Sequence, residues 1–170
     1  MSEPAFPGFK VLQFAKAPIL GQVKTRMQPH LSLEECVSLH QALTEHAFHR
    51  VTQANVCDHE LWVGSHPEHA FFTSLLEQST SHIRTQRGAD LGDRMGHAVA
   101  SQFERQANLR GAIVIGSDCP FLTADYLTET IEALAAGSDC VIGPALDGGY
   151  VLIAFSKPGW VCSLKRVRRT

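Results

Sequence analysis

Apolar and polar positions along this chain follow two periods in turn, which predicts strands separated by helices. Six short segments show the apolar runs or the alternation of β-strands: residues 9–15, 55–63, a few residues around 83, 112–116, 140–143 and 150–155. The runs 112–116 and 140–143 contain no charged side chain, so we expect both strands to be covered on both faces of a sheet.

Between these strands, apolar residues recur every three or four positions, as on the buried face of a helix. Ser32 and Glu35 have the spacing of a capping box at the start of the first such segment, and Thr123 can cap the last. Further helices are expected after Pro67 and through residues 95–103. Strands and helices in alternation predict a three-layer α/β fold with a mostly parallel central sheet.

The composition narrows the class of protein. The 170 residues carry a formal net charge of -2, which offers no overall attraction to nucleic acids or anionic membranes. No apolar run approaches the roughly 20 residues that span a bilayer, and residues 1–8 lack the features of a signal peptide, so a cytoplasmic location is expected. The five cysteines form no C-x-x-C pair, which argues against a zinc site. We find no repeat or linker and expect one domain, residues 1–170.

The loop after the first strand, residues 16–29, concentrates positive charge. Lys16, Lys24 and Arg26 lie close together in the sequence, and Gly21 between them allows a ligand to approach the backbone. Three cations with backbone amides suit a di- or triphosphate. The glycine spacing before Lys24 is not that of a Walker A loop, and a solvated basic loop is the alternative interpretation.

Two aspartates lie in positions suited to a metal. Asp118 follows the run 112–116, at the carboxyl end of its strand, where open parallel sheets bind ligands. Mg²⁺ takes one or two carboxylates together with phosphate oxygens, although an Asx turn before Pro120 is the alternative role for this aspartate. Asp147 precedes two glycines in a tight turn where a metal or substrate comes close to the backbone. Taken alone, an Asp-Gly hairpin turn explains it better.

A third glycine-bearing loop, residues 86–94, opens the helix through residues 95–103. Helix amino termini favour anions, and the backbone there can hydrogen-bond a nucleobase or a ribose. The two glycines of this loop are a weak signal in isolation. His97 follows on the same helix, where a structural role explains it better than a role in a site.

Five motifs occur in the order in which a known family has them: residues 14–18 (FAKAP), 21–26 (GQVKTR), 88–95 (GADLGDRM), 116–120 (GSDCP) and 143–150 (GPALDGGY). This succession resembles a bacterial family of GT-A glycosyltransferases, or nucleotide-diphospho-sugar transferase-like proteins. The family is related more distantly to 2-phospholactate guanylyltransferase and the molybdenum-cofactor guanylyltransferase, and some relatives are assigned to arsenosugar biosynthesis. The resemblance spans about residues 9–157 and implies a Rossmann-like GT-A fold.

The resemblance also implies a role for each motif at a nucleotide site. The phosphate contacts would be Lys16, Gly21, Lys24 and Arg26. The contacts to the base and ribose would be Gly88, Asp90, Leu91, Gly92 and Arg94. Asp118 would bind the divalent metal, Mg²⁺ or Mn²⁺, and Asp147 would be a second metal ligand or a contact to the acceptor. The catalytic residues would then be Lys16, Lys24, Asp118 and Asp147.

The function that follows from the resemblance is a metal-dependent transferase that acts on a nucleotide sugar or a nucleoside triphosphate and has a small-molecule acceptor. Glycosyl and nucleotidyl transfer both stay open, because both use this fold and this phosphate and metal site. No nucleic acid partner and no membrane insertion are expected.

The end of the chain departs from the family. Residues 160–170 match none of its motifs, and four cations crowd residues 165–169. A chain without the family's usual C-terminal elements suggests an alternative function, a non-catalytic nucleotide-binding or assembly module. Sheet edges or apolar surface left uncovered in this way would favour a homo-oligomer.

Overall fold

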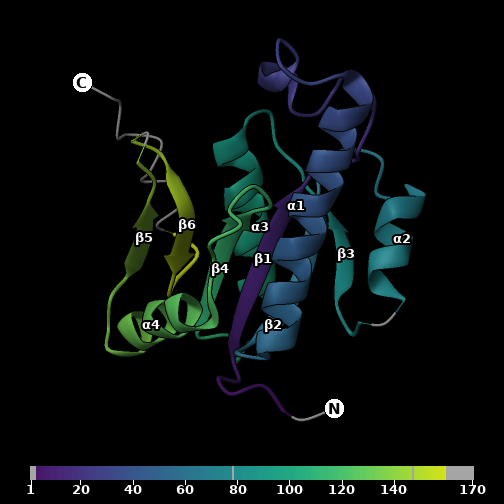
Figure 1. Ribbon diagram of the computed structural model, residues 1–170. Helices are drawn as coiled ribbons and strands as arrows, with labels where there is room; N and C mark the ends of the chain where they lie inside the picture. The colour runs from purple at the N-terminus through teal and green to yellow at the C-terminus, as the bar shows by residue number, and fades with distance from the viewer. Residues whose placement is uncertain (1–2, 78, 147, 160–170) are drawn as a thin grey trace.

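The computed structural model describes residues 3–77, 79–146 and 148–159, which fold around one six-stranded sheet (Figure 1). The strands are β1 (Phe9–Ala15), β2 (Asp58–Val63), β3 (His82–Thr85), β4 (Gly111–Gly116), β5 (Cys140–Pro144) and β6 (Tyr150–Phe155). They lie in the order β3-β2-β1-β4-β6-β5, with β1 to β4 parallel and β6 antiparallel to both of its neighbours. The predicted, mostly parallel α/β sheet is confirmed.

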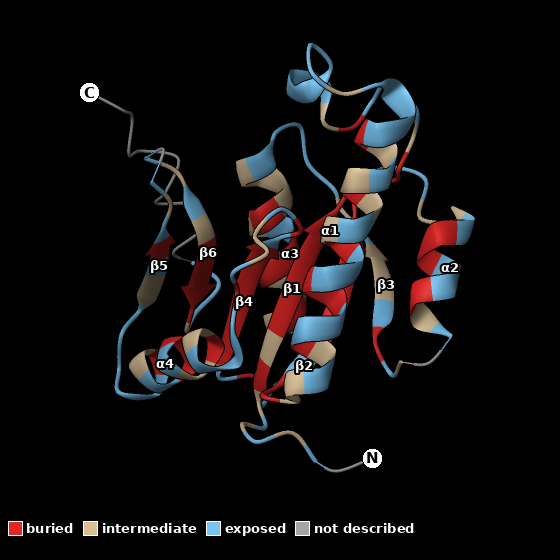
Figure 2. Cartoon of the chain, in the orientation of Figure 1, coloured by how far each residue is buried: buried red, intermediate tan, exposed pale blue. Residues whose placement is uncertain are grey.

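The four α-helices form the outer layers. They are α1 (Leu33–Ala54), α2 (Ala70–Leu76), α3 (Leu91–Arg105) and α4 (Ala124–Ala135), and a short 3-10 helix, η1 (Thr25–Met27), interrupts the first loop. In Figure 1, α1 and α4 lie in front of the sheet and α3 lies behind it. Separate apolar clusters fill the two interfaces, one of them built on α3. Figure 2 shows that β1 and β4 are buried along most of their length, as expected at the centre of three layers.

Local capping signals in the sequence set the helix ends. Ser32 and Glu35 form the predicted capping box, with each side chain accepting a hydrogen bond from the other residue's backbone N–H. Thr123 caps α4 by accepting from the backbone N–H of Tyr126 at 3.2 Å, also as predicted. At the other end of α1, Asn55 adopts a left-handed conformation (φ 46°), so β2 begins at residue 58 and not at 55.

One strand is less buried than its sequence indicates. The run 140–143 predicts a strand covered on both faces, but β5 lies at the edge of the sheet and Ile142 is 51% exposed. Strand β6, joined to β5 by a short turn, pairs antiparallel between β5 and β4 and takes the inner position. An apolar sequence therefore marks a strand here but does not reveal its place in the sheet.

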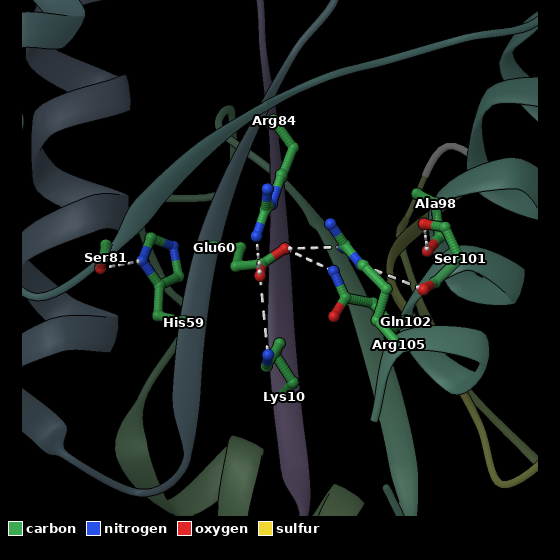
Figure 3. Close-up of polar contacts among 9 residues, drawn as sticks. All are labelled: Lys10, His59, Glu60, Ser81, Arg84, Ala98, Ser101, Gln102 and Arg105. Atoms are coloured by element: carbon green, nitrogen blue, oxygen red, sulfur yellow. Dashed lines mark hydrogen bonds and ion pairs between the residues drawn. The ribbon is translucent and has the colours of Figure 1, made fainter. Parts of the chain in front are cut away.

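A buried carboxylate joins three strands to α3 (Figure 3). Glu60 on β2 lies 3.6 Å from each of three cationic groups: Lys10 Nζ, Arg84 Nη2 and Arg105 Nη2. Gln102 of α3 also donates a hydrogen bond to it. A buried carboxylate is tolerated when it is paired and hydrogen-bonded in this way, so we interpret Glu60 as a structural residue that orders the packing of α3.

Two further observations bear on the sequence predictions. No helix among the described residues is both long and apolar enough to cross a bilayer. The C-terminal segment, residues 160–170, lies outside the described residues, and the prediction made for it stays a prediction.

Candidate functional site

A cavity of about 560 Å³ opens at the carboxyl ends of β1 and β4. The chain leaves β1 toward β2 on one side and leaves β4 toward β6 and β5 on the other, which makes this the switch point of the sheet. Six of the residues predicted from the motifs line the cavity: Lys16, Lys24, Arg26, Leu91, Arg94 and Asp118. Motifs far apart in the sequence therefore meet at one site.

The central contact of this site is an ion pair between Lys24 and Asp118. The ammonium Nζ lies 2.6 Å from the carboxylate Oδ1, which is also hydrogen-bond geometry. The lysine side chain is only 16% exposed, whereas the aspartate side chain is 68% exposed and open to the cavity. The lysine thus fixes the position of Asp118, while much of the aspartate side chain stays accessible to a ligand.

The backbone of Lys24 is itself unusual. Its φ of 50° lies in the left-handed region, which is unfavourable for a residue with a side chain. Its carbonyl accepts hydrogen bonds from the backbone N–H of Met27 at 2.8 Å and from the Cys36 thiol at 3.6 Å. Buried Val23 anchors the preceding position. These contacts hold Lys24 in a strained conformation that directs its ammonium toward Asp118.

Positive charge dominates the cavity wall. Among the described residues that line it, Lys16, Lys24, Arg26 and Arg94 stand against the single carboxylate of Asp118. Backbone and side-chain contacts fix this wall: His40 Nε2 donates to the carbonyl of Lys16 at 2.9 Å, which ties the end of β1 to α1. A concave surface with this excess of cations suits a ligand with several negative charges, such as a polyphosphate.

The third loop brings only some of its predicted contact residues to the cavity. Leu91 and Arg94 line the cavity, but Gly88, Asp90 and Gly92 do not. Asp90 caps α3 by accepting from the backbone N–H of Asp93 at 2.7 Å, and the carbonyl of Gly88 accepts from Arg94 Nε at 3.3 Å. These residues shape the loop, and the wall of the site here consists of Gln86, the exposed Leu91 and Arg94.

Gly88 is needed for that shape. Its φ is +148°, and a Cβ built there would lie 2.6 Å from both the backbone nitrogen of Arg94 and the Cβ of Asp93. Only glycine fits such an approach, because a side chain would have to displace the backbone at the start of α3. Gly21, by contrast, has a positive φ of 75°, but nothing lies within 4 Å of a Cβ placed at that position, and Gly21 does not line the cavity.

Buried polar residues beneath the cavity were missed by sequence reasoning. Gln13 on β1 donates to Ser117 Oγ at 3.0 Å and to the carbonyl of Thr44 at 3.2 Å. Ser117 in turn donates to the carbonyl of Phe14 at 2.8 Å, which joins the end of β4 to the end of β1. Because Ser117 directly precedes Asp118, these bonds fix the point from which the aspartate projects. The amide side chain of Gln13, in the otherwise apolar run 11–15, is the feature of the sequence that indicates such a buried hydrogen-bond network.

His59 extends this network away from the site. Its Nε2 lies 3.1 Å from Gln13 Oε1 and its Nδ1 lies 2.8 Å from Ser81 Oγ. Burial lowers the pKa of His59 to about 3, because the charged form would lose its hydration. Gln13 Oε1 can only accept, so the neutral imidazole carries its proton on Nε2 and accepts from Ser81 at Nδ1.

Two more side chains position the loops around the cavity. Gln86 Nε2 donates to the carbonyls of Trp62 at 2.8 Å and Ala15 at 3.4 Å, which links the third loop to the ends of β1 and β2. His46 on α1 donates from Nε2 to the carbonyl of Pro120 at 3.0 Å, two residues beyond Asp118.

His97 is outside the cavity and packs edge-on against Trp62, in agreement with a structural role.

The predicted metal site stays a prediction. The described residues contain no group of three or more His, Cys, Asp or Glu side chains that could hold a metal ion. Asp147 lies outside the described residues, in the short segment of sequence between β5 and β6. A single accessible carboxylate beside a cationic cavity fits a metal ion that takes its other ligands from phosphate oxygens and water.

Several solved structures have the same fold as this chain. A proposed nucleotide-diphospho-sugar transferase from Desulfovibrio desulfuricans G20 is 26% identical, with 92% of this chain and 68% of that chain covered and a TM-score of 0.77. CMP:2-keto-3-deoxy-manno-octonic acid synthetase, solved with CTP, is 9% identical (95% and 79% covered, TM-score 0.55). Rv0371c from Mycobacterium tuberculosis H37Rv, solved with manganese, is 14% identical (94% and 75% covered, TM-score 0.52).

The predicted fold class is therefore confirmed: the chain has the Rossmann-like α/β fold of the nucleotide-diphospho-sugar transferases. Residues 23–168 match a family described as an uncharacterized protein conserved in bacteria (DUF2064), and the chain belongs to that family. No curated protein matches the sequence at a significant level.

Proposed function

We propose that this protein is a divalent-metal-dependent transferase that uses a nucleoside triphosphate or a nucleotide sugar as donor. The observation that carries the proposal is the Lys24–Asp118 pair inside a cavity of four cations at the switch point of the sheet. The cationic side chains can bind phosphates, and the exposed aspartate can bind a metal ion that those phosphates also coordinate. The CTP and manganese complexes of proteins with this fold support the same kind of ligand.

The phosphates are expected to bind between two walls of the cavity. Lys16, Lys24 and Arg26 approach from the first loop, and Arg94 approaches from the amino-terminal turn of α3. The exposed side chain of Leu91, the first residue of that helix, offers an apolar surface for the base or the ribose. The donor is thus oriented with its phosphates toward the ends of β1 and β4.

The metal, Mg²⁺ or Mn²⁺, would be held by Asp118 together with phosphate oxygens, and when bound it supplies charge that stabilises the leaving group. Asp147 is a candidate second ligand. Lys24 is the residue positioned to change partners: its ammonium contacts Asp118 in this structure and would contact a phosphate oxygen when the donor is bound. The lysine then balances the negative charge of both groups in turn.

Catalysis at such a site depends on orientation and electrostatics. The cations offset the charge that develops on a leaving pyrophosphate or nucleoside diphosphate, and the rigid ends of β1 and β4 fix the position of the phosphates. The attacking oxygen comes from the acceptor, so no nucleophile from the protein is required. Nucleotidyl and glycosyl transfer break different bonds within the donor. The identity of the donor that binds therefore shows which of the two reactions the protein catalyses.

A thermal-shift panel tests this proposal. Nucleoside triphosphates and nucleotide sugars are each added with and without Mg²⁺ or Mn²⁺, and the melting temperature is measured. Ligand at ~100 times its dissociation constant adds about 2.7 kcal/mol of stability, which moves the melting temperature by several degrees at this chain length. A metal-dependent shift that is selective for one donor is expected. No shift with any donor would reject the proposal, and a shift without product in a labelled-donor assay would favour the non-catalytic alternative.

A further inference from the structure

A second hollow of about 560 Å³ begins at the residue after Asp118. It lies between the segment that leads from β4 into α4 and the end of the β5–β6 hairpin. Cys119, Phe121 and Tyr126 line one side, and Leu146 and Val151 line the other. We call this hollow the apolar groove. It has no lining residue in common with the cationic cavity, but Asp118 of the cavity and Cys119 of the groove are consecutive in the chain.

The lining of the apolar groove is uncharged. None of the described residues that line it is an Asp, Glu, Lys, Arg or His. Phe121 is 85% exposed and Leu146 is fully exposed, so two large apolar side chains face solvent on either side of the groove. Apolar side chains gathered in this way on a protein surface are typical of a binding site, whereas a single exposed leucine is not.

The floor of the groove has a specific construction. The Tyr126 ring of α4 crosses β5 at Gly143, where a Cβ would overlap the tyrosine hydroxyl. Glycine at this position therefore lets the aromatic ring lie directly on the strand. The ring also packs against the apolar cluster that contains Leu122 and Leu127, so the floor is rigid although the rim is exposed. A rigid apolar floor beside a reactive site favours binding of a defined ligand.

We propose that the apolar groove binds the acceptor, and that the acceptor carries an alkyl or aromatic portion joined to the oxygen that attacks the donor. This inference rests on the proposed function. A donor in the cationic cavity places its phosphates at Asp118, so an acceptor in the adjoining groove has its reacting oxygen at the same residue. The reaction forms a bond from that oxygen to the transferred phosphorus or sugar carbon, and the bond to the leaving phosphate breaks. The acceptor hydroxyl loses its proton to solvent.

The acceptor class follows from the lining. A strongly charged acceptor would need ionic partners, which the described lining lacks, and burying its charge without them is costly. An apolar portion gains about 0.8 kcal/mol for each methylene removed from water, so even a small phenyl or alkyl group binds measurably. The cations of the first loop remain free for the donor.

The test uses 2-phenylethanol as an apolar alcohol and glycerol as its polar control. Methyl NMR spectra of the full chain are recorded during titration with each alcohol. We expect 2-phenylethanol to shift the methyl signals of Leu122, Leu146 and Val151, and glycerol to leave them unchanged. Leu146→Ser should weaken 2-phenylethanol binding roughly tenfold, the effect of about two buried methylenes. Leu20→Ser, a change at another exposed leucine outside the groove, should leave binding unchanged.

A second measurement tests whether the bound alcohol points its hydroxyl group toward Asp118. The protein is loaded with Mn²⁺ and the nucleotide that gives the largest thermal shift, and relaxation of the 2-phenylethanol protons is measured. Bound Mn²⁺ relaxes nearby protons most, so the hydroxymethyl protons should relax faster than the ring protons. Asp118→Asn should remove the difference. Equal relaxation, or faster relaxation of the ring, would overturn the inference.

Other occupants of the groove give distinct results. Methyl shifts that change on dilution without any alcohol would show that a second copy of the chain fills the groove. Cross-peaks from Leu146 to Val167, which lies outside the described residues, would show that the chain's own end fills it. Either result, or no groove shifts at all, overturns this inference while nucleotide binding persists. Failure of every nucleotide to bind would instead reject the proposed function, and this inference with it.

Discussion

Lys24 Nζ and Asp118 Oδ1 are 2.6 Å apart although 94 residues separate them in the sequence. The lysine comes from the loop after β1 and the aspartate from the end of β4, so their contact depends on the parallel pairing of these two strands. In this structure the positive charge of Lys24 balances the negative charge of the Asp118 carboxylate, to which a metal would bind. Phosphates that draw Lys24 away would leave Asp118 available, and this exchange predicts that donor and metal bind cooperatively.

Asp118→Asn should abolish the metal-dependent part of nucleotide binding. The amide keeps the size of the side chain but removes the charge that attracts a divalent cation. Stability should change little, because an ion pair with an exposed partner contributes at most about 1 kcal/mol. Calorimetric titration with nucleotide in the presence and absence of Mg²⁺ measures the effect. Asp139→Asn, which removes an exposed carboxylate paired with Lys157, is the matched control. Metal-dependent binding that persists in Asp118→Asn would contradict the metal assignment.

Lys24→Met should weaken binding of a nucleoside triphosphate by roughly 10- to 100-fold, the range expected for one charge-assisted hydrogen bond to phosphate. Methionine retains most of the apolar length of lysine, so the loop can keep its packing. Lys157→Met removes another lysine from an ion pair on the surface and should leave affinity unchanged. The affinities of the two variants are compared at two salt concentrations. Equal affinities for both would show that Lys24 does not contact the phosphates.

Gly88→Ala should lower nucleotide affinity although Gly88 does not line the cavity. The added Cβ would collide with the backbone at the start of α3, and its φ of +148° is unfavourable for alanine. Both effects displace Arg94 and Leu91, which do line the cavity. Gly159→Ala is the control, because nothing lies within 4 Å of a Cβ at that position. If Gly88→Ala binds nucleotide like the control, the third loop does not form part of the donor site.

Strong local signals made much of the fold predictable. The apolar run of β4 and the capping box of Ser32 and Glu35 depend on neighbouring residues, and the structure has both where the sequence indicates. The place of a strand in the sheet depends on distant partners, which is why the sequence of β5 predicts a buried strand although β5 lies at the edge. Its partner β6 lies between β5 and β4. The pattern of apolar residues does not indicate this order of strands.

The candidate site divides in a similar way. Charged residues in the segments that follow strands, such as Lys24 after β1 and Asp118 after β4, could be predicted to lie near each other because the ends of parallel strands meet at one edge. Gln13 and Gln86 were missed because their roles are hydrogen bonds to backbone carbonyls or side chains that only the folded chain brings near. Gly88 was predicted as a ligand contact, which stays a prediction; its second role, in the shape of the backbone, is one that a motif does not reveal.

His59 should make the folded protein less stable in mild acid. Burial lowers its pKa from 6.5 to about 3, so below pH 6.5 the unfolded chain binds a proton that the folded chain excludes until about pH 3. The unfolded state therefore gains stability as the pH falls through this window, by about 1.4 kcal/mol per pH unit, or roughly 2 kcal/mol by pH 5. Urea unfolding at pH 7 and pH 5 measures the difference.

A variant and a spectroscopic titration isolate the contribution of His59 to that pH dependence. His59→Gln removes the titrating group, and the loss of stability between pH 7 and pH 5 should shrink by most of those roughly 2 kcal/mol. His82→Gln changes a histidine that lies exposed on β3 and should retain the full loss. If His59→Gln proves too unstable to compare, the imidazole signals of His59 in the wild-type protein are followed by NMR as the pH is lowered. They should not titrate between pH 7 and pH 5, because protonation would place an unpaired charge beside Gln13 and Ser81 in the core. Titration of His59 near pH 6 in the folded protein would contradict the burial argument.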